Sequence, residues 1–188
     1  MKNIVIFASG RGSNAQKIIT YFRDSDRVNI TCIIASKKTA GVLDLAAANE
    51  IPSIVLEKNS FIKTDHIVET LNDLETDLII LAGFLWKIPP YLVKAFPKKI
   101  VNIHPALLPK YGGKGMYGHH IHKAVKKAGD LESGITIHYV NEIYDDGEIL
   151  FQTATDITSD MTADDIGAAV LKLEHEHFPK IIDKILFP

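Results

Sequence analysis

The stretch Asn3-Ile4-Val5-Ile6-Phe7-Ala8-Ser9 runs directly into Gly10-Arg11-Gly12-Ser13-Asn14-Ala15. The first part is almost unbroken in its apolar character, which is typical of a strand buried on both faces of a parallel sheet. The second part fits the pattern G-x-G-x-x-A, in which glycines make a tight turn and a helix begins. A strand, a glycine turn and a helix in this order predict a Rossmann-like α/β fold.

The rest of the chain continues the alternation of strands and helices. We predict strands over Asn3–Ser9, Val28–Ser36, Pro52–Leu56, Leu78–Ala82, Ile100–His104, Gly134–Tyr139 and Ile149–Thr155. We predict helices over Asn14–Arg23, Ala40–Asn49, Thr64–Leu74, Pro89–Ala95, His120–Ala128 and from a cap at Thr162 to about Leu186. Pro179 should kink or interrupt the last helix. This pattern indicates one domain over residues 1–188, with a mostly parallel sheet and helices on both faces.

The composition is that of an ordinary globular protein, with 188 residues, 46% of them hydrophobic. A formal net charge of -2 gives no general attraction to nucleic acid or to an anionic membrane surface. No apolar stretch reaches the roughly 18 residues that a membrane span needs. The first strand begins at once, without room for a signal peptide. We therefore expect a cytoplasmic protein.

The glycine turn has several interpretations. It suits the diphosphate of a dinucleotide, but the second strand ends in Ala35-Ser36-Lys37-Lys38, without the carboxylate that usually holds an NAD ribose. The sequence is also compatible with NADP as the ligand, and with a single phosphate monoester bound at the helix start by Ser13 and Asn14. The simplest alternative is a plain turn in which Asn14 caps the helix.

Polar side chains alternate at the end of the strand Ile100-Val101-Asn102-Ile103-His104, before Pro105. Because side chains in a strand repeat every two positions, Asn102 and His104 lie on the same side. Ligands of open α/β sheets bind at the carboxyl ends of the strands. An amide beside an imidazole can stabilise an oxyanion and transfer protons, although a strand histidine can also be purely structural.

Three other segments carry candidate groups. In the acidic segment 141–148, one carboxylate could hold the imidazole in its charged form. Leu85, Trp86 and Ile88 follow a strand and could form the wall of a pocket for a flat heteroaromatic ligand. The histidines His119, His120 and His122 lack the cysteines or the HExxH spacing of zinc sites, so we expect them to line a cleft without metal.

Together these segments resemble the phosphoribosylglycinamide formyltransferases, a family of folate-dependent enzymes of purine synthesis. The matching elements occur in family order over nearly the whole chain: Ser9-Gly10-x-Gly12-Ser13-Asn14, Leu81-Ala82-Gly83-Phe84, Asn102-Ile103-His104-Pro105-x-Leu107-Leu108-Pro109-Lys110-Tyr111, Gly134-x-Thr136-x-His138, Asp145-x-Gly147 and Glu174-His175.

The resemblance implies a formyl transfer from 10-formyltetrahydrofolate to the amine of glycinamide ribonucleotide, without a metal. It implies that Asn102, His104 and Asp145 carry the chemistry. It further implies that Gly12, Ser13 and Asn14 hold the substrate phosphate and that Glu174 holds its ribose. By the same resemblance the folate lies against Leu85, Trp86, Lys87, Ile88 and Asn102, with Lys63 near its tail. We expect these two small molecules as the partners, with no nucleic-acid or membrane partner, and a monomer or homodimer.

The nearest alternative is a formyltetrahydrofolate hydrolase, which delivers the formyl group to water. Hydrolases usually carry an additional N-terminal domain, and methionyl-tRNA formyltransferases an additional C-terminal one. An NADP-binding module and a catalytically dead binding protein are alternatives of a different class.

Overall fold

The computed structural model describes residues 1–188 and contains one seven-stranded sheet in the order β3-β2-β1-β4-β5-β6-β7. Strands β1 to β5 pair in parallel, whereas β6 and β7 are antiparallel to their neighbours. The strands are β1 (Lys2–Ala8), β2 (Val28–Ala35), β3 (Ser53–Val55), β4 (Leu78–Leu81), β5 (Ile100–His104), β6 (Glu132–Tyr139) and β7 (Ile149–Asp156). The predicted Rossmann-like, mostly parallel sheet is confirmed.

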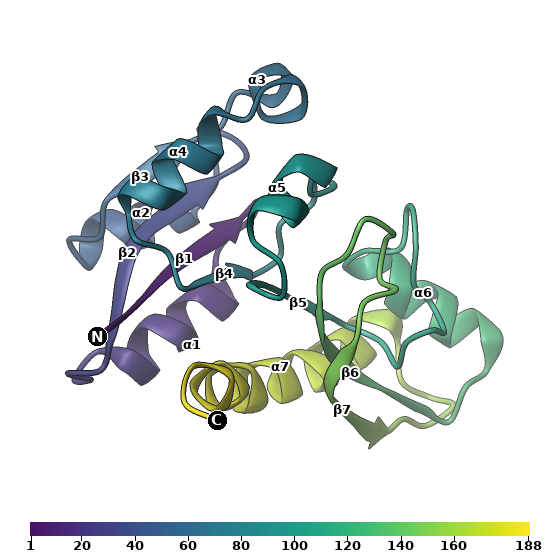
Figure 1. Cartoon of the computed structure of the whole chain (residues 1–188). Helices are drawn as coiled ribbons and strands as arrows, with labels where there is room; N and C mark the ends of the chain where they lie inside the picture. Colours follow the sequence, from purple (N-terminus) through teal and green to yellow (C-terminus); the bar gives the residue numbers. More distant parts are fainter.

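The helices cover both faces of the sheet, as predicted. They are α1 (Ser13–Phe22), α2 (Val42–Ala48), α3 (Lys58–Lys63), α4 (His66–Asp73), α5 (Pro90–Ala95), α6 (His119–Ala128) and α7 (Ala163–Leu186). Figure 1 shows α3, α4 and α5 on one side of the strands and α1 and α7 on the other. None of the helices combines the length and the apolar character that a membrane crossing requires.

The period of two in the strands divides the core into two layers. In β1, Ile4, Ile6 and Ala8 pack in the cluster that also contains buried residues of α1, α2, α6 and α7. Val5 and Phe7 pack in the cluster beneath α3, α4 and α5. Because both faces are covered, the strand needs apolar side chains at every position, which explains the unbroken run in the sequence.

Two helical predictions need correction. The segment before Thr64 contains α3, a helix of six residues that the sequence did not predict, and Glu57 caps it by accepting hydrogen bonds from Asn59 and Ser60. Of the two effects predicted for Pro179, an interruption of the last helix is wrong, since α7 runs through the proline, and a kink stays a prediction. Phe178, Ile181 and Ile182 are buried on either side of the proline and hold the helix against the core. The predicted cap at Thr162 is confirmed.

Candidate active site

A cavity of about 600 Å³ lies at the carboxyl edge of β1, β4 and β5. Its walls come from five segments and one helix residue: Gly10–Asn14, Leu81–Ile88, Asn102–Pro105, Gly113–Gly118, the β6–β7 region from His138 to Asp145, and Glu174 of α7. The volume lies within the range of ligand sites of small-molecule enzymes. Nearly all the predicted site residues therefore meet in one cavity, although the first and the last of them, Gly12 and Glu174, are 162 positions apart in the sequence.

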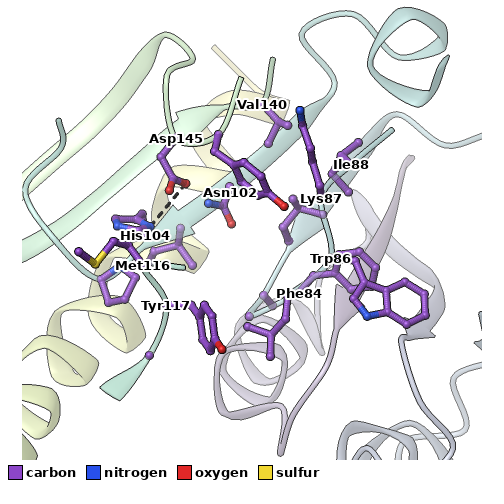
Figure 2. A pocket seen from close by; sticks show the side chains of 18 of the residues that line it. Phe84, Trp86, Lys87, Ile88, Asn102, His104, Met116, Tyr117, Val140 and Asp145 are labelled. Atoms are coloured by element: carbon purple, nitrogen blue, oxygen red, sulfur yellow. Dashed lines mark ion pairs between the residues drawn. The ribbon is translucent and has the colours of Figure 1, made fainter. Parts of the chain in front are cut away.

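His104 is 4% exposed, and both of its ring nitrogens face oxygen acceptors. Its Nε2 lies 2.9 Å from the carbonyl oxygen of Tyr111, and its Nδ1 lies 3.5 Å from Oδ1 of Asp145. Figure 2 shows the His104–Asp145 ion pair on the cavity wall. A carbonyl oxygen and an ionised carboxylate can each only accept hydrogen bonds, so both ring nitrogens must carry a proton to bond with them. The arrangement therefore suits the doubly protonated imidazolium, whose Nδ1 proton points toward Asp145.

Asp145 is itself held in place. Its Oδ2 accepts a hydrogen bond of 2.8 Å from the backbone N–H of Gly113, and its backbone is left-handed, with φ 54°. The spacing Asp145-x-Gly147 has a steric cause, because a Cβ on Gly147 would lie 1.7 Å from the carbonyl oxygen of Tyr139. Only glycine allows the loop to pass so close to β6 and return Asp145 to the cavity.

Asn102 lies opposite His138 in the antiparallel pairing of β5 with β6. The carbonyl of Tyr139 lies 2.9 Å from Nδ1 of His138, so this nitrogen donates and Nε2 of the neutral ring is left as an acceptor. Nδ2 of Asn102 lies 3.1 Å from that Nε2 and donates to it. Burial lowers the pKa of His138, which favours the neutral ring. His138 thus fixes which end of the Asn102 amide is the donor.

His138 is a residue that the sequence analysis left without a role. The signal was present in the alternation Gly134-x-Thr136-x-His138, which places Thr136 and His138 on one face of a strand. The sequence does not reveal the register of the pairing between β5 and β6, and this register places His138 opposite Asn102.

At the other end of the cavity, the start of α1 has no side-chain cap. Gly12 occupies the N-cap position with a left-handed backbone, and a Cβ there would lie 2.8 Å from Cγ2 of Val42. Asn14 is inside the helix, so the alternative in which Asn14 caps a plain turn is wrong. Uncapped backbone N–H groups beside a cavity are suited to bind an anion.

Asn14 connects this helix start to α7. Its Nδ2 donates to Oε2 of Glu174 at 2.6 Å, and both residues are 8% exposed. Burial raises the pKa of Glu174 to about 7, and the hydrogen bond from Asn14 opposes that rise with a smaller effect. The Oδ1 atom of Asn14 is buried without a partner, so this end of the cavity retains an acceptor for a ligand.

The wall after β4 is aromatic and apolar. The rings of Phe84 and Trp86 lie 5.8 Å apart, and both pack against Phe61. Leu85 is 56% exposed at the rim, whereas Ile88 is buried. The ammonium of Lys87 lies 5.3 Å from the centre of the Tyr144 ring, which belongs to the β6–β7 loop. Figure 2 shows Phe84 and Trp86 on the opposite side of the cavity from His104 and Asp145.

Two groups of predicted residues lie outside the cavity. Lys63 ends α3 as an exposed side chain and is absent from the cavity wall, so its contact with a folate tail stays a prediction. The prediction that His119, His120 and His122 line the cleft is wrong. Nδ1 of His119 lies 3.3 Å from Asp164, and the His122 ring fills the space above Gly167 of α7.

Comparison with known proteins identifies the family of the chain. The family described as Formyl transferase matches residues 2–182. The phosphoribosylglycinamide formyltransferase of Bacillus subtilis is 36% identical over 191 residues, covering 99% of this chain and 95% of its own length. The chloroplastic phosphoribosylglycinamide formyltransferase of Arabidopsis thaliana is 40% identical and covers 98% of this chain. The chain spans 65% of that plant relative and 61% of a second one, from Vigna unguiculata.

Solved structures give the same result. The crystal structure of phosphoribosylglycinamide formyltransferase from Anaplasma phagocytophilum superposes with a TM-score of 0.90 at 32% identity. The match covers 98% of this chain and 86% of that one. The fold, the order of the sequence motifs and the similarity to known proteins all indicate the same family. The chain therefore belongs to the formyl transferase family, in the group of the phosphoribosylglycinamide formyltransferases.

Proposed function

We propose that this protein transfers the formyl group of 10-formyltetrahydrofolate to the amine of N1-(5-phospho-D-ribosyl)glycinamide, a step of de novo purine synthesis. The observation that carries the proposal is that a single cavity combines an uncapped helix start, a wall of aromatic residues and, between them, Asn102, His104 and Asp145. A phosphorylated amine and a folate can therefore meet at these three side chains.

The substrate phosphate binds at the start of α1. Backbone N–H groups of Gly12, Ser13 and Asn14 donate to its oxygens, and the positive end of the helix dipole favours the charge. Glu174 accepts hydrogen bonds from the ribose hydroxyls. Asn14 supports both contacts, because its amide already holds Glu174 at 2.6 Å.

The folate binds across the opposite wall. Leu85, Trp86 and Ile88 offer apolar surface to the flat pterin ring, and Asn102 closes its inner end. Lys87 and the exposed Lys63 provide positive charge for the acidic tail.

The chemistry takes place at the edge of β5. As the substrate amine attacks the formyl carbon, a new C–N bond forms and negative charge develops on the formyl oxygen. The Nδ2–H of Asn102 that is not bonded to His138 donates to that oxygen, and the positive charge of the His104 ring beside it stabilises the developing negative charge. A single donor of this kind lowers a barrier by about 3–4 kcal/mol in other enzymes.

Collapse of the tetrahedral species breaks the C–N bond to the folate. His104 supplies a proton to the departing folate nitrogen, and the proton lost by the attacking amine restores its charge. The Asp145 carboxylate, whose Oδ1 lies 3.5 Å from Nδ1, stabilises the positive charge of the ring before the proton is given up and after it is regained. Neither step requires a metal.

The test is a spectrophotometric assay of folate release from 10-formyltetrahydrofolate, run with and without glycinamide ribonucleotide. Release that requires the amine is the expected result, whereas equal release without it would establish the hydrolase instead. Equilibrium titration with NADPH tests the dinucleotide alternative. Tight NADPH binding without any response to the ribonucleotide would overturn the proposal.

We further propose that residues 1–188 act as one formyltransferase domain in the cytoplasm, as a monomer or homodimer without a nucleic-acid partner. The net charge of -2 supports the last point, because it offers no general attraction to a polyanion. Sedimentation of the purified protein distinguishes the two assembly states.

A further inference from the structure

Tyr111 connects His104 to the opposite side of the loop that follows β5. Its carbonyl oxygen accepts the hydrogen bond from Nε2 of His104 at 2.9 Å. Its side chain turns away from the main cavity and lines a second cavity of about 430 Å³, together with Leu107, Val125 and Ser133. Tyr111 therefore touches the catalytic histidine through its backbone but does not line the site where substrate would bind.

The Tyr111 backbone adopts an unusual conformation. Its φ is 57°, in the left-handed region that disfavours a residue with a large side chain. This conformation must be held by other contacts, and the tyrosine side chain supplies one. Its hydroxyl donates to Oδ2 of Asp130 at 2.7 Å.

Asp130 is a firm anchor for this hydroxyl. It lies in the connection between α6 and β6, directly after Gly129, which ends α6 in the left-handed conformation. Nζ of Lys110 lies 2.8 Å from each of its carboxylate oxygens. The hydrogen bonds from Lys110 and Tyr111 both lower the pKa of Asp130, so the carboxylate stays ionised at neutral pH.

The orientation of the His104 ring depends on this anchor. If the Tyr111 carbonyl moves, Nε2 loses its only hydrogen-bond acceptor in the protein, and the ring can rotate about its χ2 bond. Nδ1 would then leave both Asp145 and the position where the formyl oxygen is stabilised. The 3.5 Å between Nδ1 and Oδ1 of Asp145 leaves this contact too weak to hold the ring alone.

We propose that Tyr111 and Asp130 are positioning residues for His104. They hold the Tyr111 carbonyl against Nε2, and this contact turns Nδ1 toward Asp145 and the reacting formyl group. The inference rests on the proposed formyl transfer for its effect on turnover, but the effect on the His104 ring is independent of any substrate.

The kinetic test uses Tyr111→Phe, which removes only the hydroxyl. We expect kcat to fall about tenfold, the factor that corresponds to one lost hydrogen bond, with both KM values within about twofold. Asp130→Ala should cause the same loss, and the double variant should lose no more than either single one, because the two residues act as a unit. A wild-type kcat in Tyr111→Phe, or losses that multiply in the double variant, would overturn the proposal.

The matched control is Tyr91→Phe. Like the Tyr111 hydroxyl, the Tyr91 hydroxyl donates a short hydrogen bond, in this case to the backbone carbonyl of Phe61 at 2.6 Å, but Tyr91 has no hydrogen bond with His104. This variant should lose stability in thermal unfolding and keep its kcat. A fall in kcat equal to that of Tyr111→Phe would mean that general destabilisation explains both.

Nitrogen-15 NMR of the histidine rings supplies the second readout. In the unmodified protein, Nε2 of His104 should carry a proton that exchanges slowly with solvent, because it is bonded to a carbonyl in a buried site. Tyr111→Phe should make that proton exchange faster, whereas Tyr91→Phe should not. An unchanged His104 signal in Tyr111→Phe would refute the positioning role. Because no substrate is present, failure of the proposed formyl transfer would leave this result intact.

Discussion

The two ends of the cavity are built on different principles. At the end where we propose that the phosphate binds, which we call the anion end, the start of α1 offers the backbone N–H groups of Gly12, Ser13 and Asn14. Glu174 is the single side chain there that comes from a distant part of the chain. Backbone donors survive the loss of a side chain. A substitution at this end should therefore weaken binding by a limited amount and leave the chemical step intact.

At the end where the formyl group reacts, which we call the reacting end, the groups that would act on the substrate are the side chains of Asn102, His104 and Asp145, and each is held by another group. His104 is held by Tyr111 and Asp145, Asp145 by Gly113, and Asn102 by His138. Such a network fixes geometry within a fraction of an ångström, which is what transition-state stabilisation requires. The difference between the two ends predicts that kcat and KM respond to separate sets of residues.

The largest expected effect is at the reacting end. His104→Ala and Asp145→Asn should each lower kcat by about 10²- to 10³-fold, because each removes stabilisation that exists only in the transition state. Steady-state kinetics with both substrates, together with a direct titration of folate binding, measure the change. Equal losses in folate affinity and turnover would show that the two ends are not separate in function.

The next effect concerns the stability of the anion end. The pKa of Glu174 is raised from its ordinary value of 4.5 to about 7 in the folded protein, because burial penalises the charged form. The folded state therefore binds more protons than the unfolded state between these two values. Stability falls as the pH rises through this window, and the full cost, about 3 kcal/mol at most, is present above pH 7.

Glu174→Gln removes this cost, so the variant should be more stable than the unmodified protein at pH 8 but not at pH 4. Denaturant unfolding at both pH values measures the difference. Glu176→Gln, an exposed position on the same helix that pairs with Lys180, is the matched control and should change stability by less than about 0.5 kcal/mol. The hypothesis fails if both variants respond to pH in the same way.

Much of the anion end could be predicted from the sequence, because residues 10–15 are contiguous and their glycine spacing has a direct steric meaning. Asn102 and His104 were also placed correctly, since alternation in a strand is a local property. The contact of His138 with Asn102 depends on the pairing of β5 with β6, which no local pattern fixes. Helix α3 has only six residues, too few for an apolar period to be visible.

A smaller effect is expected for the side chains at the start of α1. Ser13→Ala and Asn14→Ala should raise the KM for glycinamide ribonucleotide by about tenfold, the value of one hydrogen bond to a charged group. The KM for the folate and the value of kcat should stay near normal, because the backbone donors remain. A fall in kcat without a change in KM would place these residues in the chemical step instead.

The smallest expected change in kinetics concerns Lys87 and Tyr144. They lie where the wall after β4, against which we propose that the folate binds (the folate wall), meets the loop that carries Asp145. Lys87 follows β4 and Tyr144 directly precedes Asp145, and the ammonium lies 5.3 Å from the ring centre. A cation–π contact at an exposed site contributes about 0.5–1 kcal/mol. Lys87→Met keeps most of the aliphatic stem, so we expect only a two- to fivefold rise in the KM for 10-formyltetrahydrofolate.

A double-mutant cycle separates this contact from a direct role of the lysine in folate binding. If Lys87 acts by holding the β6–β7 loop through Tyr144, then Lys87→Met should have little effect in a Tyr144→Leu background. If the lysine instead contacts the acidic folate tail, its removal should cost the same in both backgrounds. An equal cost in both backgrounds would mean that Lys87 contributes only to folate binding. A small effect in the Tyr144→Leu background would mean that Lys87 also holds the loop that carries Asp145. Coupling would also appear as a modest fall in kcat, because the position of Asp145 depends on the same loop.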